Sequence, residues 1–389
     1  MGAPLLASPF RPFFLATAIY AAATIFAWIG HLFTGWPIPL GENPVRWHAH
    51  EMLFGFLPAA ITGFLLTAMT NWTGALPLRD RGLLALVMLW LAGRVAMWCA
   101  GWWPAWSVAA IDIAYLPVLA LYAGGVLLRY GNRRNLFLVG VLGLFALANV
   151  LFHLQSLDVV ESTVLGERMA MNLITLLMVV IAGRITPAFT GNWLSMHGLD
   201  PTVVQTVPAL DRAAIAATAL MIPIDFAVGP VLTGSLMALL ACALNGARLV
   251  LWGGWHIRHE PLLWILHLGY AWIVLALLLK GLQPFTAGIP PTAWLHAIGA
   301  GAAGTLIMGV MTRVSLGHTG RCLALPRFGV TMYVAVLAAG TLRVAAAIGA
   351  IDYRAGLTAS AVAWIAAFAL FAAVYWPILS RPRADGRPG

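Results

Sequence analysis

The sequence predicts an all-α, polytopic membrane protein that crosses the bilayer about twelve times. Of its 389 residues, 61% are hydrophobic and only 9% are charged, whereas about a quarter of the residues in a soluble domain are charged. Apolar runs recur along the whole chain, and each reaches the roughly 20 residues that a helix needs to cross a bilayer. We therefore expect residues 1–389 to form a single integral membrane domain, with the lipid bilayer as its solvent.

Twelve spans are predicted from these runs. The first begins with Arg11 and Pro12 and lacks a small-residue cleavage site, so we interpret it as a retained helix and not a signal peptide. The boundary between the seventh and eighth spans, around Asp225 and Gly229, is the least defined. The predicted spans are 10–33, 48–71, 81–101, 104–129, 134–155, 162–186, 208–227, 229–251, 260–281, 291–313, 327–350 and 355–379.

Arginine residues predict the orientation of these spans. Arg79, Arg129, Arg248 and Arg321 stand in alternate loops, most of them with further arginines nearby, and the loops between them hold few basic residues. Basic residues accumulate in the cytoplasmic loops of membrane proteins. We therefore expect both termini, and the loops after even-numbered spans, to be cytoplasmic.

A short pattern at the ends of three spans suggests an internal repeat. Arg184-Ile185-Thr186 precedes Thr190-Gly191, and Arg313-Val314-Ser315 precedes Thr319-Gly320. The second span also ends in Thr73-Gly74. A recurrence at every fourth span would indicate three related four-helix units. The alternative is that Thr-Gly simply ends many helices, because glycine is favoured just past a helix C-terminus.

Cysteine and charge patterns exclude several classes of function. Cys99, Cys242 and Cys322 lie far apart and form neither a C-x-x-C pair nor a C-x-x-C-H haem attachment site. Any haem would therefore be bound without thioether bonds. The basic residues are scattered over short loops and form no patch interleaved with aromatic residues, so we expect no nucleic-acid partner.

The stretch Trp47-His48-Ala49-His50-Glu51-Met52 concentrates metal-ligand chemistry at the start of the second span. Histidine and tryptophan also anchor helix ends among lipid headgroups, which is the alternative interpretation. Ionisable groups inside a membrane usually face a functional interior, and this favours a binding site. In a regular helix His48 and His50 point about 200° apart, so one would serve a metal and the other a neighbouring centre.

The candidate ligands fall into two layers when they are placed by predicted depth. They come from several distant spans, as metal sites in helix bundles usually do. Glu51 is also the candidate catalytic carboxylate. The periplasmic layer contains His48, His50, Glu51, His153 and His296, and the cytoplasmic layer contains His267 and His318.

Histidine alone leaves the metal open, because neutral imidazole binds haem iron, copper and zinc. Arginines inside or near the ends of the spans would neutralise haem propionates, since the guanidinium group matches carboxylate geometry. They would equally well pair with Asp112 or with a backbone carbonyl. The candidate haem-binding residues are His48, His267, His296, Arg94, Arg184 and Arg313.

Several strings together resemble the NnrS family. They are Ser8–Phe14, Trp47–Met52, Asn71–Gly74, Gly183–Arg184, Pro187–Trp193, Trp264–Tyr270 and Met311–Gly320. The resemblance implies a twelve-helix protein of the bacterial inner membrane that contains non-covalent haem b and copper. It also implies a role in nitric-oxide metabolism and in resistance to nitrosative stress. A weaker, architectural likeness to haem-copper oxidases, which bind metals on helices 2, 6 and 10, includes histidines on the second and tenth spans. The sixth span departs from that pattern, because it offers no histidine.

These observations predict a protein that handles nitric oxide. The leading hypothesis is an oxidoreductase that acts on nitric oxide at a haem beside a second metal, with Glu51 binding that metal or passing protons. Its electrons would come from a quinol or a redox protein. The alternatives are a non-catalytic haem and copper protein that binds or senses nitric oxide, and a transporter of a metal or a metal–nitrosyl species.

Overall fold

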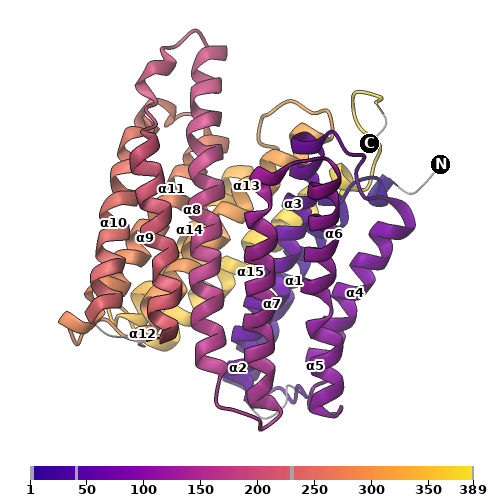
Figure 1. The fold of residues 1–389 in the computed structure, drawn as a ribbon, viewed down its shortest axis with the longest axis vertical. Helices are drawn as coiled ribbons and strands as arrows, with labels where there is room; N and C mark the ends of the chain where they lie inside the picture. Colours follow the sequence, from indigo (N-terminus) through magenta and orange to yellow (C-terminus); the bar gives the residue numbers. More distant parts are fainter. Residues whose placement is uncertain (1–3, 40–42, 228–231, 388–389) are drawn as a thin grey trace. The chain divides into compact units, whose positions relative to one another are not determined.

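The structure is a computed structural model that describes residues 4–39, 43–227 and 232–387. Helices account for all of its regular structure, and these residues include no strand (Figure 1). The all-α fold expected from the sequence is confirmed.

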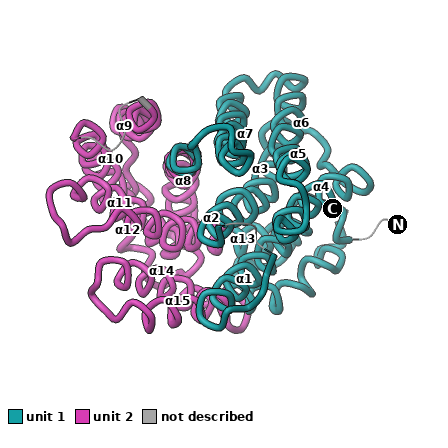
Figure 2. Tube along the Cα trace, turned by 90° about the horizontal axis from the view of Figure 1, so that it is seen from below, with its two compact units in different colours: residues 1–170, 311–324, 368–389 teal, residues 171–310, 325–367 magenta. Residues whose placement is uncertain are grey.

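The chain forms two compact units, which are coloured separately in Figure 2. Unit 1 consists of residues 1–170, 311–324 and 368–389, and unit 2 of residues 171–310 and 325–367. Each unit thus combines segments that are far apart in the sequence. The single membrane domain and the three four-helix repeats stay predictions. Three helices contribute to both units, namely α8 (Thr163–Met196), α13 (Gly304–His318) and α15 (Tyr353–Leu379).

Unit 1 contains the N-terminal helices and the ends of α13 and α15. Its α-helices are α1 (Phe10–Thr34), α2 (Pro44–His50), α3 (Leu57–Thr73), α4 (Asp80–Trp98), α5 (Ala105–Ile113), α6 (Tyr115–Arg129) and α7 (Phe137–Ser156). Its shorter segments are the 3-10 turns η1 (Pro4–Leu6) and η3 (Arg133–Asn135) and the π-helical segment η2 (Glu51–Phe56).

Unit 2 contains most of α8 and the helices that follow it. Its other α-helices are α9 (Pro208–Ala227), α10 (Leu232–Leu251), α11 (Pro261–Leu282), α12 (Pro291–His296) and α14 (Gly329–Ala347). Its shorter segments are the 3-10 turns η4 (Pro201–Val203), η5 (Gly254–Ile257) and η6 (Gln283–Phe285) and the π-helical segment η7 (Ala297–Ala303).

Eleven helical segments of the described chain are long and apolar enough to cross a membrane. They correspond to eleven of the twelve predicted spans. The exception is the predicted span 208–227, which forms α9. Every 18-residue stretch of this helix contains three charged residues, Asp211, Arg212 and Asp225, so it is too polar to count as a membrane span. The predicted span 229–251 begins at residues 229–231, which lie outside the described residues, and α10 covers the rest.

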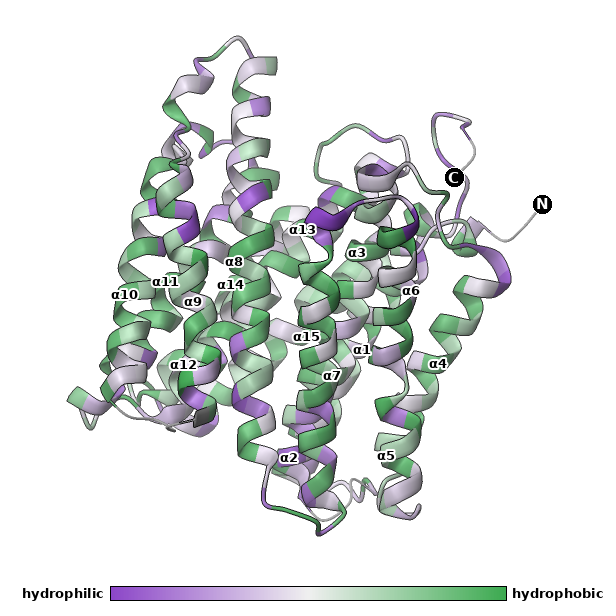
Figure 3. Ribbon diagram, in the orientation of Figure 1, coloured by the Kyte–Doolittle hydropathy of each residue, from purple (hydrophilic) through white to green (hydrophobic). Residues whose placement is uncertain are grey.

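The outer faces of these helices are apolar. In Figure 3 most of each helix is green, and hydrophilic residues gather near helix ends and at a few interior positions. Leu121 is 75% exposed and Val250 is 81% exposed, although both stand on long apolar helices. Such exposure is costly in water and is expected where side chains face lipid. The multi-pass membrane protein predicted from the sequence is confirmed.

Helix α8 is longer than the sequence suggested. The predicted sixth span ends at residue 186, and Pro187, which lacks an N–H and disfavours a helix interior, follows it. The structure continues α8 through Pro187 to Met196. The Thr190 hydroxyl donates a hydrogen bond to the Thr186 carbonyl at 2.9 Å. The ten-residue extension shows that one proline did not end this helix.

Arg11 joins the first and last helices of unit 1. Its side chain is fully buried, and Nη1 donates to the carbonyls of Leu379 at 2.8 Å and Arg381 at 2.7 Å. These carbonyls lie at and just beyond the C-terminus of α15, where helix carbonyls lack partners within the helix. The start of α1 and the end of α15 therefore lie at the same end of unit 1.

Two of the membrane spans change from α-helix to π-helix and back. In the span 44–73, η2 follows directly after His50, and in the span 291–318, η7 follows directly after His296. π-Helical turns are rare and occur frequently at functional sites. Each of them begins beside a histidine that the sequence had singled out.

Candidate metal centre

The segment that carries His50 begins with a well-defined helix N-terminus. Oδ1 of Asn43 accepts hydrogen bonds from the backbone N–H groups of Val45 and Arg46 at 3.0 and 3.1 Å. Pro44 occupies the first helical position, where an N–H would have no partner within the helix. His50 then ends α2 and Glu51 begins η2, and both side chains are fully buried.

The imidazole of His50 has oxygen acceptors at both ring nitrogens. Its Nδ1 lies 2.8 Å from Oε1 of Glu51. Its Nε2 lies 3.0 Å from Oδ2 of Asp112 and 3.0 Å from Oδ1 of Asn149. A neutral imidazole has only one N–H. One of the two ring nitrogens of His50 therefore carries no proton, although it lies within hydrogen-bond distance of an oxygen.

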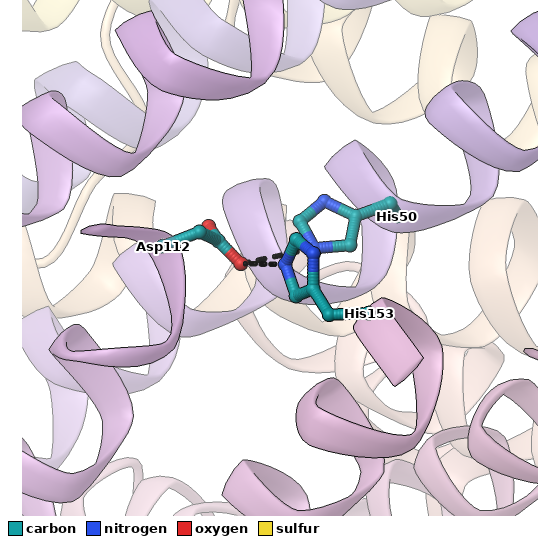
Figure 4. Close-up of side chains that lie close together, drawn as sticks. All are labelled: His50, Asp112 and His153. Atoms are coloured by element: carbon teal, nitrogen blue, oxygen red, sulfur yellow. Dashed lines mark hydrogen bonds and ion pairs between the residues drawn. The ribbon is translucent and has the colours of Figure 1, made fainter. Parts of the chain in front are cut away.

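Asp112, on α5, is the point at which three side chains converge. Its Oδ2 lies 2.9 Å from Nε2 of His153 and accepts a hydrogen bond from Nδ2 of Asn149 at 2.8 Å. Figure 4 shows the rings of His50 and His153 directed at this same oxygen. His153 and Asn149 are four residues apart on α7, so they share one face of that helix.

Arg94, on α4, joins the two carboxylates of the cluster. Its Nη1 donates to Oε1 of Glu51 at 2.5 Å, and its Nη2 donates to Oδ1 of Asp112. The guanidinium is almost fully buried. Gly55 makes room for it, because a Cβ at that position would lie 2.7 Å from Nη1 of Arg94.

The charges of this cluster do not balance. Glu51 and Asp112 carry two negative charges when ionised, and Arg94 is the one permanent positive charge among the described residues that contact them. A buried charge is costly unless it is paired. With both histidines neutral, the cluster therefore has a net charge of −1 that one bound cation or proton would offset.

The donor set fits a metal ion. One ligand atom each from His50, Asp112 and His153 lies within 4.8 Å of the others. A metal at Nε2 of His50 would leave Nδ1–H to donate to Glu51, the carboxylate–histidine pairing usual behind metal ligands. Oε2 of Glu51 is buried and has no hydrogen-bond partner among the described residues, which adds a further oxygen donor within the centre.

Two imidazoles and a carboxylate suit several metals. Zinc, copper and non-haem iron all bind such nitrogen and oxygen ligands. Oδ1 of Asn149, 3.0 Å from Nε2 of His50, offers a further oxygen. We call this candidate metal-binding cluster the metal centre and define it as His50, Asp112, Asn149 and His153, supported by Glu51 and Arg94.

A cavity of about 640 Å³ lies beside the metal centre within unit 1. His153 forms part of its wall, together with Phe152 and Ser156 of α7. Trp102 and Trp103, in the turn between α4 and α5, line it as well. These two tryptophans are 74% and 41% exposed, so this part of the cavity wall reaches the surface of the described residues. The cavity thus leads from the outside of unit 1 to a residue of the metal centre.

The other predicted ligands of unit 1 have different surroundings. His48 is two residues from His50, but its ring stacks on Trp28 with the centroids 4.9 Å apart. His318 ends α13, and its ring centroid lies 5.6 Å from that of Phe10. Arg313 is half-buried in α13. Their assignments as ligands or haem partners stay predictions.

The remaining predicted residues belong to unit 2. Nδ1 of His296 lies 2.7 Å from the carbonyl of Thr292 in its own helix. Nε2 of His267 lies 3.0 Å from Oγ1 of Thr190. That hydroxyl donates to Thr186, so Nε2–H of His267 is the donor. Arg184 is exposed on α8. The assignments of His267, His296 and Arg184 also stay predictions.

Sequence reasoning missed two members of the metal centre. Asp112 was considered only as a partner for arginine, and Asn149 was not considered at all. Asp112 did carry a signal, because an acidic residue inside an apolar span is rare and usually functional. Asn149 carried none, since a single amide in an apolar helix has many explanations.

The chain was also compared with known proteins. The family model described as NnrS protein matches residues 4–383. The comparison with curated proteins found no match.

Proposed function

The chain belongs to the NnrS family, and we propose that it is a metalloprotein of the bacterial inner membrane that reduces nitric oxide at the metal centre. Family membership supports a membrane protein connected with nitric oxide. The metal, the reaction and the inner membrane are our proposal. The observation that carries it is the convergence of Nε2 of His50 and Nε2 of His153 on one oxygen of Asp112.

The residues that would hold the metal are His50, Asp112 and His153. A copper or non-haem iron ion held there would supply one-electron chemistry for joining two nitric oxide molecules. Copper is the choice that the family resemblance favours. Nitric oxide is small and apolar and concentrates in lipid, so a buried centre inside the membrane can receive it without a polar channel.

The surrounding residues orient the ligands and hold protons. Glu51 accepts from Nδ1–H of His50 and thereby fixes the tautomer that turns Nε2 toward Asp112. Oε2 of Glu51 has no partner among the described residues, so it is the atom at which a proton for the reaction would be held. Arg94 keeps both carboxylates in place.

Fewer contacts in the structure support a haem b site than support the metal site. A haem needs an axial histidine with a free ring nitrogen, and His267 uses Nε2 to donate to Thr190. His267 in this conformation does not fit as an iron ligand through that nitrogen. We therefore derive no step from haem. The haem candidates, namely His48, His267, His296, Arg94, Arg184 and Arg313, stay predictions.

Metal analysis of the purified protein tests this proposal. His50→Ala and His153→Ala should each lose the copper or iron that the wild-type protein retains. His197→Ala is the matched control, because His197 is exposed and stacks on Trp193 outside the metal centre. Full metal content in both cluster variants would refute the centre.

Nitric-oxide consumption with an artificial electron donor tests the reaction itself. Turnover in the wild type that disappears in His50→Ala and persists in His197→Ala would support an oxidoreductase. A protein that keeps its metal and shows nitric-oxide-induced spectral shifts without turnover would be a binding or sensing protein instead. Metal uptake into vesicles would indicate the transporter.

A further inference from the structure

The cavity beside the metal centre is larger than the proposed reaction requires. Its volume of about 640 Å³ equals roughly twenty water molecules at about 30 Å³ each. Nitric oxide and protons need far less space. The volume falls within the range of about 300–1,000 Å³ that is typical of small-molecule sites.

We propose that this cavity binds the ring of a membrane quinol, which supplies electrons to the metal centre through His153. The proposal rests on the proposed function, because it names the electron donor for that reaction. It concerns a binding site that can be tested without any turnover.

The walls of the cavity suit a flat aromatic ring. Trp47, Trp102, Trp103 and Phe152 line it, and Met97 adds a polarisable thioether. Aromatic rings pair favourably with one another in stacked or edge-on arrangements. A diatomic gas or an inorganic anion would use little of this surface.

His153 connects the cavity to the metal centre. The residue is only 3% exposed, and its Nε2 lies 2.9 Å from Oδ2 of Asp112. This contact at Nε2 is the one side-chain contact of His153 with a hydrogen-bond acceptor among the described residues, and the residue forms part of the cavity wall. With Nε2 bound in the centre, Nδ1–H is a donor that a quinol oxygen in the cavity can satisfy. One imidazole would then join the electron donor to the metal.

The polar groups of the cavity favour an electron-rich ligand. Arg46 is the one charged side chain among the described residues that line it. Since no carboxylate is among these lining residues, a cationic ligand would find no direct counter-charge in this wall. Arg46 and Ser156 would instead donate to the second ring oxygen of a quinol or quinone.

The mouth of the cavity resembles a membrane interface. Trp102 and Trp103, which line the cavity, are 74% and 41% exposed. Tryptophan is enriched where a protein meets the headgroup region of a bilayer. A quinol dissolved in lipid can therefore reach this opening, whereas a soluble redox protein would bind outside the cavity.

The electron count of the proposed reaction also fits a quinol. One quinol loses two electrons and the protons of its two hydroxyl groups and becomes a quinone. Two nitric oxide molecules accept them: an N–N bond forms, one N–O bond breaks, and the released oxygen leaves as water. Quinol plus two nitric oxide thus gives quinone, nitrous oxide and water.

A fluorescence titration of the protein in lipid nanodiscs tests the site. A short-chain ubiquinone should quench the tryptophan emission with a saturable curve. Ala105→Trp places a bulky ring in the cavity wall at an exposed position and should weaken binding at least tenfold. Ala110→Trp is the matched control, because it adds the same fluorophore to an exposed position of α5 outside the cavity.

A second variant tests the site independently of whether Ala105→Trp folds. Trp102→Leu removes one exposed ring from the mouth and should weaken binding roughly threefold to tenfold. Quenching that does not saturate, or equal affinity in wild type, Ala105→Trp and Trp102→Leu, would overturn the quinol site. So would a haem band in the purified protein that Ala105→Trp abolishes and Ala110→Trp keeps.

The measurements distinguish failure of the quinol site from failure of the proposed function. Metal content is measured on the same samples, and ring binding does not depend on the metal. Retained metal without saturable quinone binding refutes the quinol site alone. Saturable quinone binding in a protein without metal refutes the proposed function and leaves the ligand class of the cavity supported.

Discussion

Nδ1 of His50 lies 2.8 Å from Oε1 of Glu51, although the two residues are neighbours in the sequence. Consecutive residues of a regular α-helix point about 100° apart. The contact occurs where α2 ends and the π-helical segment η2 begins. It determines which nitrogen of His50 is directed at Asp112, and so the change of helix type is part of the metal centre.

Glu51→Gln should lower the metal affinity about 10–100-fold, as loss of a carboxylate behind a histidine ligand usually does. The amide keeps the size of the side chain but removes its charge. Competition with a chelator of known affinity measures the change. Glu167→Gln on α8 is the control, and an equal effect of both substitutions would show that Glu51 has no special role.

Gly55→Ala should displace Arg94 and loosen the metal centre. The added Cβ would lie 2.7 Å from Nη1 of Arg94 and 2.8 Å from the ring of Tyr20. Overpacking of this kind costs about 1–3 kcal/mol. Gly143→Ala is the control, since a Cβ there meets nothing within 4 Å. The half-point of chemical unfolding should fall for the first variant only.

Arg94→Leu should destabilise the protein by about 3–5 kcal/mol, because it leaves two buried carboxylates without their cation. Unfolding by denaturant, followed by circular dichroism in detergent, measures the loss. Added metal should restore more stability to this variant than to the wild type. Arg134→Leu, at an exposed position, should change little, and a similar loss in both would contradict the pairing.

Lys280→Met should leave Asp225 buried and uncompensated in unit 2. Nζ of Lys280 donates to Asp225 at 2.6 Å and to Oδ1 of Asn172 at 2.8 Å. Breaking such a pair costs about 3–5 kcal/mol, whereas replacing both charges costs less. The double variant Lys280→Met/Asp225→Asn should therefore be more stable than Lys280→Met. Additive losses would show that the two side chains are not coupled.

The spans could be predicted because each depends on one local property, an apolar run of sufficient length. The start of α2 also had a local signal in Asn43-Pro44. The π-helical segment after His50 had none, because its residues are equally compatible with an α-helix. The extension of α8 to Met196 had no local signal either, because the helix continues through Pro187 although proline disfavours a helix interior.

The metal centre was predictable only in part, for a related reason. Depth placed His50 and His153 in one layer, and the structure does bring them together. Depth also grouped His48 with them, yet its ring stacks on Trp28. Which helix faces meet is decided by packing between α2, α5 and α7, and a single sequence contains no record of those contacts.

The ion pair between Arg94 and Asp112 has a consequence for how the chain enters the bilayer. The two residues are 18 positions apart on the successive helices α4 and α5. Inserted alone, either helix would carry an uncompensated charge into the hydrocarbon, at a cost of up to about 2.5–3.5 kcal/mol. If the two helices insert together as a hairpin, the side chain on each helix neutralises the charge on the other. We expect α4 and α5 to leave the translocation machinery together, so that the Arg94–Asp112 pair of the metal centre forms during synthesis, before any metal arrives.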